Sequence, residues 1–157
     1  VVVVRIFPWP PRISKVPMMK DSFGLEVSTT SAECAAAVGA YYEAVLAYRP
    51  FPAWVASSED AMANDPKCPL ARVLSADCAF CRGDAPRAKE LLRDLQADEK
   101  GSSGSWTWRE SRYVEAWDRW VNCGDPAGCY EVLLEVVTRH PEDLFAVKRG
   151  HIMGLIL

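Results

Sequence analysis

The stretch TWRESRYVEAWDRWVNCGDPAGCYEVLLEVVTRHP, residues 107–141, decides the fold, because it contains two helix patterns separated by a turn. In the first pattern, the large apolar side chains of Tyr113, Trp117 and Trp120 recur at the spacing of one helix face. The Gly-Asp-Pro sequence at residues 124–126 then offers a turn glycine, an N-cap aspartate and a proline at the first helical position. The stretch therefore predicts two antiparallel helices joined by a tight turn.

A second turn of the same kind lies earlier in the chain, at Gly83-Asp84. Both glycines are followed, at equal distances, by one small and two aliphatic residues, which form the pairs Ala88 and Cys129, Leu92 and Leu133, and Leu95 and Val136. The small residue is needed because two helices joined by a tight turn approach most closely near that turn. A single hairpin cannot bury both of its faces, so such units stack on one another. The pattern predicts a repeated helical hairpin.

The spacing of the hairpin resembles the tetratricopeptide repeat, which also ends on a proline in the place of Pro141. The sequence GSSGS at residues 101–105 is expected to be a flexible break, and it lengthens the unit beyond the ~34 residues of a regular repeat. We therefore expect an all-α fold of antiparallel helical hairpins stacked as an irregular tetratricopeptide-like solenoid. The alternative is a helical bundle whose hairpins share their capping pattern by chance.

Capping and turn residues predict six or seven helices, and no segment alternates apolar and polar residues in the way that would predict a sheet. The expected helices cover residues 30–48, 53–63, 70–82, 86–97, 107–122, 126–140 and 143–157. Thr30 and Glu33 have the spacing of a capping box at the start of the first helix.

Two segments at the ends of the chain are expected to differ from the helical domain, which we place at residues 25–157. Residues 1–24 begin with four valines and then contain four prolines, so we expect a disordered or non-native N-terminal extension there. The apolar run at residues 152–157 predicts that the domain is truncated at its C-terminus. It also predicts self-association through the last helix, whose apolar face has no following segment to cover it.

Composition argues against several classes of partner. The net charge is −3 with both signs interspersed, whereas a protein that binds nucleic acid usually carries a basic patch. No apolar run approaches the ~18 residues needed to span a membrane. The even count of six cysteines is compatible with disulfides, but no secretory signal is recognisable, and several of the cysteines replace small apolar residues on helix faces. We therefore expect a cytoplasmic protein with reduced core cysteines that binds neither nucleic acid nor membrane.

The residues that could carry chemistry favour structural roles. Cys78 and Cys81 have the spacing of a redox or metal pair, but they lie near a helix end, where the dipole disfavours a thiolate. No second pair completes a zinc site, so core packing is the preferred role. His140 is expected to interact as a cation with the C-terminus of a helix. No nucleophile elbow or phosphate loop occurs. We predict no catalytic, cofactor-binding or metal-binding residue.

Three residues are candidates for binding a partner. Trp106 and Trp108 lie next to the break, and they either anchor a partner or fill the hinge. His151 lies among apolar residues of the last helix, and it is either a buried, hydrogen-bonded side chain or a ligand contact. Trp117 and Trp120 fit the repeat pattern and are expected in the core.

Several short segments resemble the tetratricopeptide repeat protein 38 family. They are Ser28-Thr29-Thr30-Ser31, Arg109-Glu110 followed by Val114, Ala116 and Gly124-Asp125, and His140-Pro141-Glu142-Asp143-Leu144-Phe145-Ala146 followed by His151. The resemblance covers residues 25–157, which would be the N-terminal third of a family member. Members often carry a histidine in the place of Tyr113 and another near the start of the third helix, so a site built on those positions is in doubt here.

The resemblance implies an all-helical, cytosolic, solenoid-like protein without an established reaction. Together with the repeat pattern, it predicts a protein- or peptide-binding scaffold that is not an enzyme and needs no cofactor. The alternative is the N-terminal part of an enzyme or small-molecule-binding protein whose site is completed by residues beyond this chain.

Overall fold

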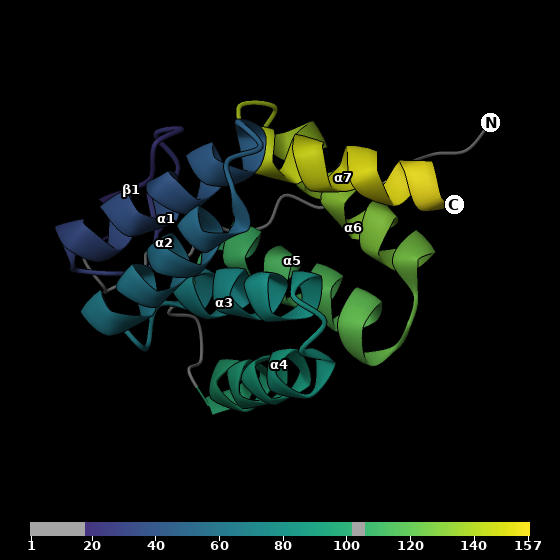
Figure 1. Ribbon diagram of the computed structural model, residues 1–157, viewed down its shortest axis with the longest axis horizontal. Helices are drawn as coiled ribbons and strands as arrows, with labels where there is room; N and C mark the ends of the chain where they lie inside the picture. The colour runs from purple at the N-terminus through teal and green to yellow at the C-terminus, as the bar shows by residue number, and fades with distance from the viewer. Residues whose placement is uncertain (1–17, 102–105) are drawn as a thin grey trace.

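The helix patterns produce an all-helical structure in the computed structural model, which describes residues 18–101 and 106–157 (Figure 1). The α-helices in these residues are α1 (Ala32–Leu46), α2 (Phe51–Asn64), α3 (Pro69–Cys81), α4 (Ala85–Gly101), α5 (Trp108–Trp117), α6 (Pro126–Arg139) and α7 (Leu144–Ile156). A π-helical turn, η1 (Asp118–Asn122), extends α5. The predicted all-α class is confirmed. Of the break expected at residues 101–105, Gly101 is the last residue of α4, and residues 102–105 lie outside the described residues.

Glycines reverse the chain where the sequence predicts. Gly83, with a φ of 86°, lies between α3 and α4, and Gly124, with a φ of 61°, lies before α6. This left-handed backbone is strained for residues with a Cβ, which explains glycine at both turns. Asp125 caps α6 as predicted, because its carboxylate accepts a hydrogen bond from the Gly128 N–H at 2.8 Å.

The start of α1 differs from the prediction. The N-cap is Ser31, whose hydroxyl accepts from the Cys34 N–H at 3.0 Å, so the expected capping box of Thr30 and Glu33 is wrong. A complete capping box instead opens α5, where Thr107 and Glu110 each accept from the other's backbone N–H.

A small β-hairpin precedes α1, and the expectation of no sheet is wrong at this place. Strands β1 (Met19–Lys20) and β2 (Glu26–Val27) pair antiparallel, with Met19 opposite Val27. Two residues per strand are too few to show an alternating pattern in the sequence. Folded structure therefore begins before residue 25, where the helical domain was expected to start. Residues 1–17 of the expected extension lie outside the described residues.

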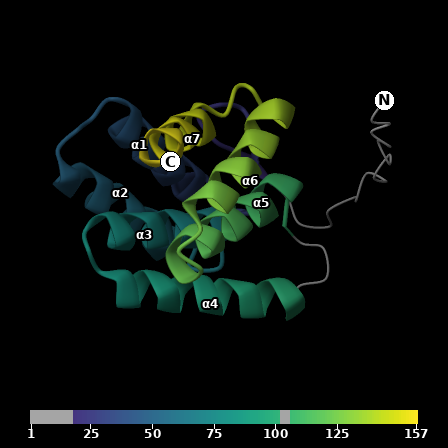
Figure 2. The same cartoon turned by 90° about the vertical axis from the view of Figure 1, so that its right-hand side faces the viewer.

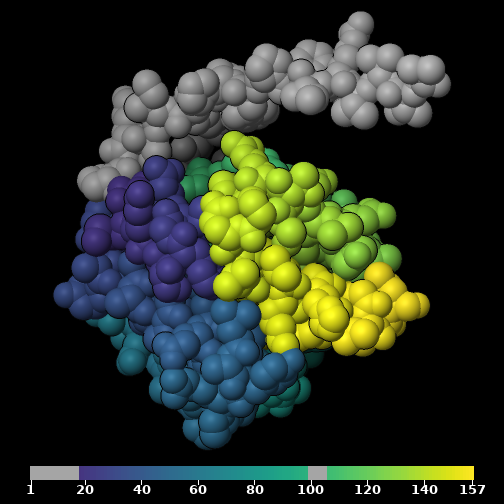
Figure 3. All heavy atoms as spheres, turned by 90° about the horizontal axis from the view of Figure 1, so that it is seen from above, coloured from purple at the N-terminus to yellow at the C-terminus, as the bar shows by residue number. Residues whose placement is uncertain are grey.

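The helices pack as successive pairs, α1 with α2, α3 with α4 and α5 with α6 (Figures 1 and 2). In both views α4 lies on the outside next to α3. Helix α7 packs on α6 and also contacts α1. The yellow surface of α7 adjoins the blue surface of the first two helices in Figure 3. The first and last helices are therefore neighbours.

Aromatic rings fill the centre that α1, α5 and α7 share. Phe145 of α7 stacks on Tyr42 of α1 with ring centroids 4.9 Å apart. The same ring lies 6.0 Å from the rings of Tyr113 and of Trp117, both on α5 and both fully buried. The sequence prediction that Trp117 is a core residue is confirmed, whereas Trp120, which was expected in the core with it, is only half-buried and packs against the core. The repeat pairs that the sequence singled out are buried as well: Ala88 and Cys129, Leu92 and Leu133, and Leu95 and Val136.

Candidate functional site

The sequence of α1, AECAAAVGAYYEAVL, has two unlike faces. Its large side chains, including Tyr41 and Tyr42, are fully buried in the core. Ala32, Ala36 and Ala40 lie one turn apart on another face, and all three are exposed. Alanine extends no further than its Cβ, so this face of the helix is low and apolar.

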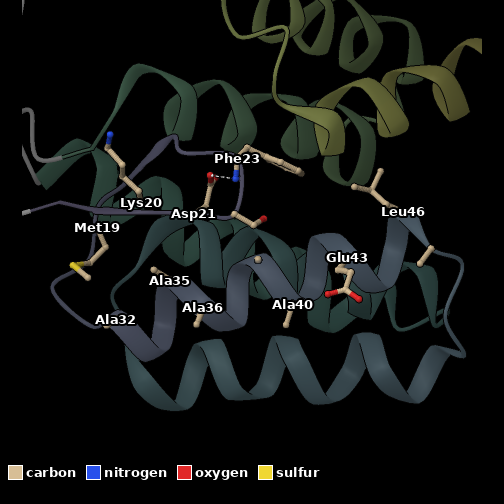
Figure 4. A pocket seen from close by; sticks show the side chains of 13 residues that line it. Met19, Lys20, Asp21, Phe23, Ala32, Ala35, Ala36, Ala40, Glu43 and Leu46 are labelled. Carbon is tan, nitrogen blue, oxygen red and sulfur yellow. Dashed lines mark hydrogen bonds between the residues drawn. The ribbon is translucent and has the colours of Figure 1, made fainter.

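An open groove of about 670 Å³ runs along this face of α1, beside the β-hairpin (Figure 4). Its lining residues are Met19, Lys20, Asp21, Ser22, Phe23, Ala32, Ala35, Ala36, Gly39, Ala40, Glu43, Leu46 and Ala47. Small residues of α1 form the floor, while Met19 and Lys20 lie near one end of the helix and Glu43 and Leu46 near the other.

Gly39 lets the hairpin approach the helix closely. A Cβ at this position would come within 3.1 Å of the Cβ of Ser22, which is tighter than an ordinary side-chain contact. The shape of the groove therefore depends on glycine and alanine at specific positions of α1, and larger side chains at these positions would fill it.

The hairpin wall of the groove is fixed to the core by Asp21 and Phe23. One oxygen of Asp21 accepts hydrogen bonds from the N–H groups of Phe23 at 3.0 Å and Leu25 at 3.1 Å. The other accepts from Arg109 of α5 at 2.7 Å, in an ion pair that is almost fully buried. The Phe23 ring stacks on Tyr42 at 5.2 Å. The wall is thus held in place without a ligand.

Arg109 also joins this wall to α7. It donates to Asp143, the N-cap of α7, at 3.0 Å, and Tyr113 donates to the same carboxylate at 2.9 Å. Burial raises the pKa of Tyr113 well above its usual value, and the negative charge of Asp143 adds to this effect. Tyr113 therefore remains a hydrogen-bond donor at neutral pH, and the cluster has the features of a structural support.

A second buried cluster surrounds Asp77 of α3. Its carboxylate accepts from Tyr41 of α1 at 2.7 Å, from Trp117 of α5 at 3.1 Å and from Arg149 of α7. Tyr41, Asp77 and Trp117 are all 0% exposed, so no solute reaches the carboxylate in this conformation. The cluster joins four helices.

Glu110 supports the other end of the hairpin. Its two oxygens accept from the backbone and the hydroxyl of Ser28, at 2.8 and 2.5 Å, and from the Thr107 N–H at 2.8 Å. Burial raises the pKa of Glu110, and the hydrogen bonds from Ser28 and Thr107 oppose that shift. These donors reduce the cost of a buried carboxylate.

The predicted partner-binding residues lie elsewhere. Trp106 and Trp108 are half-buried and pack against the core. The guanidinium of Arg139, at the end of α6, lies 4.5 Å from the centre of the Trp108 ring, and the ring of His140 lies 6.1 Å from it. His151 is exposed on α7, so the expectation that it is buried is wrong. None of the three candidates lines the groove.

The groove was missed because alanine is also the best helix former, so an alanine-rich helix carries no visible functional signal. The available hint was the spacing of Ala32, Ala36 and Ala40, which places three small residues on one face.

The cysteine pair that the sequence singled out is not poised for thiolate chemistry. Cys78 is buried and Cys81 is exposed. Burial raises the pKa of Cys78. Although Cys81 is exposed as a residue, its sulfur lies 4.0 Å from a carboxylate oxygen of Asp77, and desolvation of the thiol together with the charge of Asp77 raises the pKa of Cys81 to about 12. Across residues 18–101 and 106–157, no group of three or more His, Cys, Asp or Glu side chains is placed to hold a metal ion. The helices in these two ranges include none of the length and apolarity required to cross a bilayer.

Comparison with protein-family models finds none that matches this sequence. Searches of the curated proteins and of the solved structures find no match either. The proposals below therefore depend on the chain's own geometry.

Proposed function

We propose that this chain is a helical repeat scaffold that binds a protein or peptide segment in the groove along α1. The observation that carries the proposal is the groove itself, which is open, apolar along its floor and about 670 Å³ in volume. A floor of exposed alanines lets the backbone of a bound segment approach the helix closely, so that its larger side chains fill the space.

The length and the rigidity of the groove support a segment as the ligand. The lining residues extend from Ala32 to Ala47, the whole of α1, which corresponds to roughly 22 Å at ~1.5 Å per residue. Binding to a preformed surface loses less free energy to ordering than binding to a flexible one. The Asp21–Arg109 ion pair and the Phe23–Tyr42 stack hold the hairpin wall of the groove in place before a segment binds.

The charges beside the groove suggest a polarity for the bound segment. Lys20 is exposed near the N-terminus of α1, and Glu43 is exposed near its C-terminus, where it pairs with Arg49 at 2.5 Å. A segment with an acidic group beside Lys20 would complement that end of the groove, whereas the charge of Glu43 is already balanced by Arg49.

We also propose that the pairs α1–α2, α3–α4 and α5–α6 are tetratricopeptide-like units of an irregular solenoid, as the resemblance to the tetratricopeptide repeat protein 38 family implies. The equivalent turns at Gly83 and Gly124 and the equivalent buried pairs support this assignment. Because α7 contacts α1, the first and the last helices contribute to the same core.

Substituting two exposed alanines of the groove floor by arginine tests whether the groove binds a segment. Ala36→Arg with Ala40→Arg fills the floor at exposed positions, and arginine is nearly as good a helix former as alanine. Ala56→Arg with Ala63→Arg is the matched control, because both residues are exposed on α2 and neither lines the groove along α1.

Tagged full-length chains are used to capture partners from a cell extract, and the captured proteins are quantified by mass spectrometry. Proteins that bind in the groove are retained by the unmodified chain and by the α2 control, and lost from the groove variant. A captured set that the groove variant retains in full would contradict the proposal, provided circular dichroism shows that all three chains are folded.

A further inference from the structure

A row of side chains runs along the outer face of α7. Leu144, Lys148, His151 and Leu155 are spaced by four, three and four residues, a spacing that places them on the same side of a helix. Leu144 is 48% exposed and Leu155 is 73% exposed, and His151 is exposed between them. A helix that binds in an apolar groove uses anchors at this spacing. His151, a partner-binding candidate from the sequence, is therefore part of a helix face suited to docking.

The groove along α1 has the same spacing with side chains of the opposite size. Ala36, Ala40, Glu43 and Ala47 are separated by four, three and four residues, and all four are exposed and line the groove (Figure 4). The three alanines leave room for the larger side chains of a second helix, so that two helix axes can approach closely. The lengths correspond as well, since α1 has 15 residues and α7 has 13. The two faces are therefore complementary in shape over about three helical turns.

The two helices also carry opposite charges. Helix α1 contains Glu33 and Glu43, both exposed, and no lysine or arginine. The outer face of α7 carries the basic side chains of Lys148 and His151, and α7 contains no aspartate or glutamate. The pair of Glu43 with Arg49 is exposed and engages one carboxylate oxygen, and such a pair contributes little and is readily shared. Charge therefore favours contact of α7 with α1 over contact between two copies of α7.

The charges also favour one direction of the docked helix. With α7 antiparallel to α1 and Leu155 placed on Ala36, Lys148 falls beside Glu43, because each helix advances seven residues between the two positions. The same alignment brings the C-terminal end of α7 toward Lys20, which is exposed beside the start of α1. The C-terminal end of a helix carries partial negative charge, so it complements the lysine.

Such a contact has to form between two chains. In Figure 1, β1 and the start of α1 lie on the left, whereas the last turn of α7 lies on the right. Phe145 and Met153 are fully buried, so α7 is fixed in the core of its own chain. The last turn of α7 therefore does not reach the groove of the same chain.

We propose that the groove along α1 receives α7 of a second copy of this chain, with the helices antiparallel, Leu155 on Ala36 and His151 on Ala40. The inference rests on the proposed function, because it identifies the segment that the groove binds. One helix in one groove is a small interface, so we expect weak association, with a Kd of roughly 10–100 µM.

The test uses complementary variants of the full chain, because the contact joins two different surfaces. Ala36→Arg with Ala40→Arg blocks the groove and leaves α7 intact, whereas Leu155→Lys blocks α7 and leaves the groove intact. In sedimentation velocity at about 100 µM, the unmodified chain should associate and each variant alone should be monomeric. An equimolar mixture of the two variants should associate again, since one supplies α7 and the other supplies the groove.

Ala56→Arg with Ala63→Arg, on α2, is the control and should associate as the unmodified chain does. The inference is overturned if the unmodified chain stays monomeric, if the groove variant associates as strongly as the unmodified chain, or if the mixture remains monomeric. Association retained by the groove variant would place the contact elsewhere on the chain. It would not contradict a groove that binds another protein, which the capture experiment decides.

A second measurement avoids bulky substitutions, in case the arginines unfold the chain. Chains that carry Cys81→Ser and Cys123→Ser receive either Ala36→Cys or Leu155→Cys, and the two are mixed and oxidised with copper phenanthroline. We expect a disulfide-linked dimer with one chain of each kind, which dithiothreitol separates. Ala56→Cys in place of Ala36→Cys should give at least ~10-fold less of the mixed dimer, because a disulfide requires closely placed Cβ atoms. Equal yields from the two positions would contradict the docking.

Discussion

The carboxylate of Asp77 lies where no water reaches it, and donors from three neighbouring helices surround it. Asp21 and Asp143 are in the same situation around Arg109. A charge is costly to bury unless it is paired and hydrogen-bonded, so each of these side chains depends on its partners. Such pairs specify which helices meet more than they add to stability, since an apolar cluster of the same shape would be comparably stable.

Replacing Asp77 with asparagine should therefore destabilise the fold strongly. Asp77→Asn keeps the shape of the side chain but leaves Arg149, which is 3% exposed, without a counter-charge. We expect a loss of about 3–5 kcal/mol in the free energy of unfolding, measured in urea. Arg49→Gln breaks the exposed pair with Glu43 and should cost about 1 kcal/mol or less. Equal losses in the two variants would mean that the buried Asp77 cluster contributes no more to stability than the exposed pair of Arg49 and Glu43.

At the scale of the elements, Gly124, just before α6, and Gly128, inside α6, are required for different physical reasons. Gly124 holds a φ of 61° with open space around it, whereas Gly128 in the first turn of α6 lies against the capping aspartate. A Cβ on Gly128 would lie 2.1 Å from a carboxylate oxygen of Asp125. The first glycine is required by backbone conformation and the second by the space that the cap occupies.

Alanine should separate these two effects. Gly124→Ala introduces backbone strain alone, and we expect a loss of about 1–2 kcal/mol in the free energy of unfolding. Gly128→Ala must displace the Asp125 side chain, so it should lose the cap, which contributes roughly 0.5–2 kcal/mol. Combining Gly128→Ala with Asp125→Ala identifies the mechanism: the double variant should be no less stable than Gly128→Ala alone. Full additivity of the two losses would show that the glycine acts through something other than the cap.

The elements that could be predicted are those that local rules determine. The turns at Gly83 and Gly124, the cap at Asp125 and the helix faces of Tyr113 and Trp117 all follow from residues close in sequence. The β-hairpin could not be predicted, because it is held by Arg109, which lies 88 residues after Asp21.

The candidate site escaped prediction for a related reason. A groove is a property of two segments that approach each other, and neither the alanines of α1 nor the hairpin at residues 19–27 shows it alone. Single aromatic or ionisable side chains such as Trp106, Trp108 and His151 are conspicuous in a sequence, whereas a surface built from small residues is not.

At the scale of the whole molecule, α7 has one buried part and one exposed apolar part, and the exposed part bears on association between chains. Phe145 and Met153 are fully buried, while Leu155 is 73% exposed and Ile156 is 58% exposed. Adjacent exposed side chains of this size form an apolar patch that favours association.

We therefore expect the chain to self-associate through the last turn of α7, and Leu155→Lys to weaken that association. Leu134→Lys, at an exposed leucine of α6, is the matched control and should leave association unchanged. Sedimentation velocity over a concentration series measures the effect. A chain that stays monomeric throughout, or a Leu155→Lys variant that associates as strongly as the unmodified chain, would contradict this expectation.

The contact between α7 and α1 also governs when the protein can fold during its synthesis. Asp77 receives its counter-charge from Arg149, which lies 72 residues later, and Tyr42, which also stacks on Phe23, gains its second stacked ring from Phe145. At about 5–20 residues per second, a ribosome needs roughly 4–14 s to translate from Asp77 to Arg149. During that interval the first two hairpins exist with an uncompensated carboxylate and an uncovered aromatic face. The first two hairpins therefore cannot complete their buried contacts until α7 has emerged.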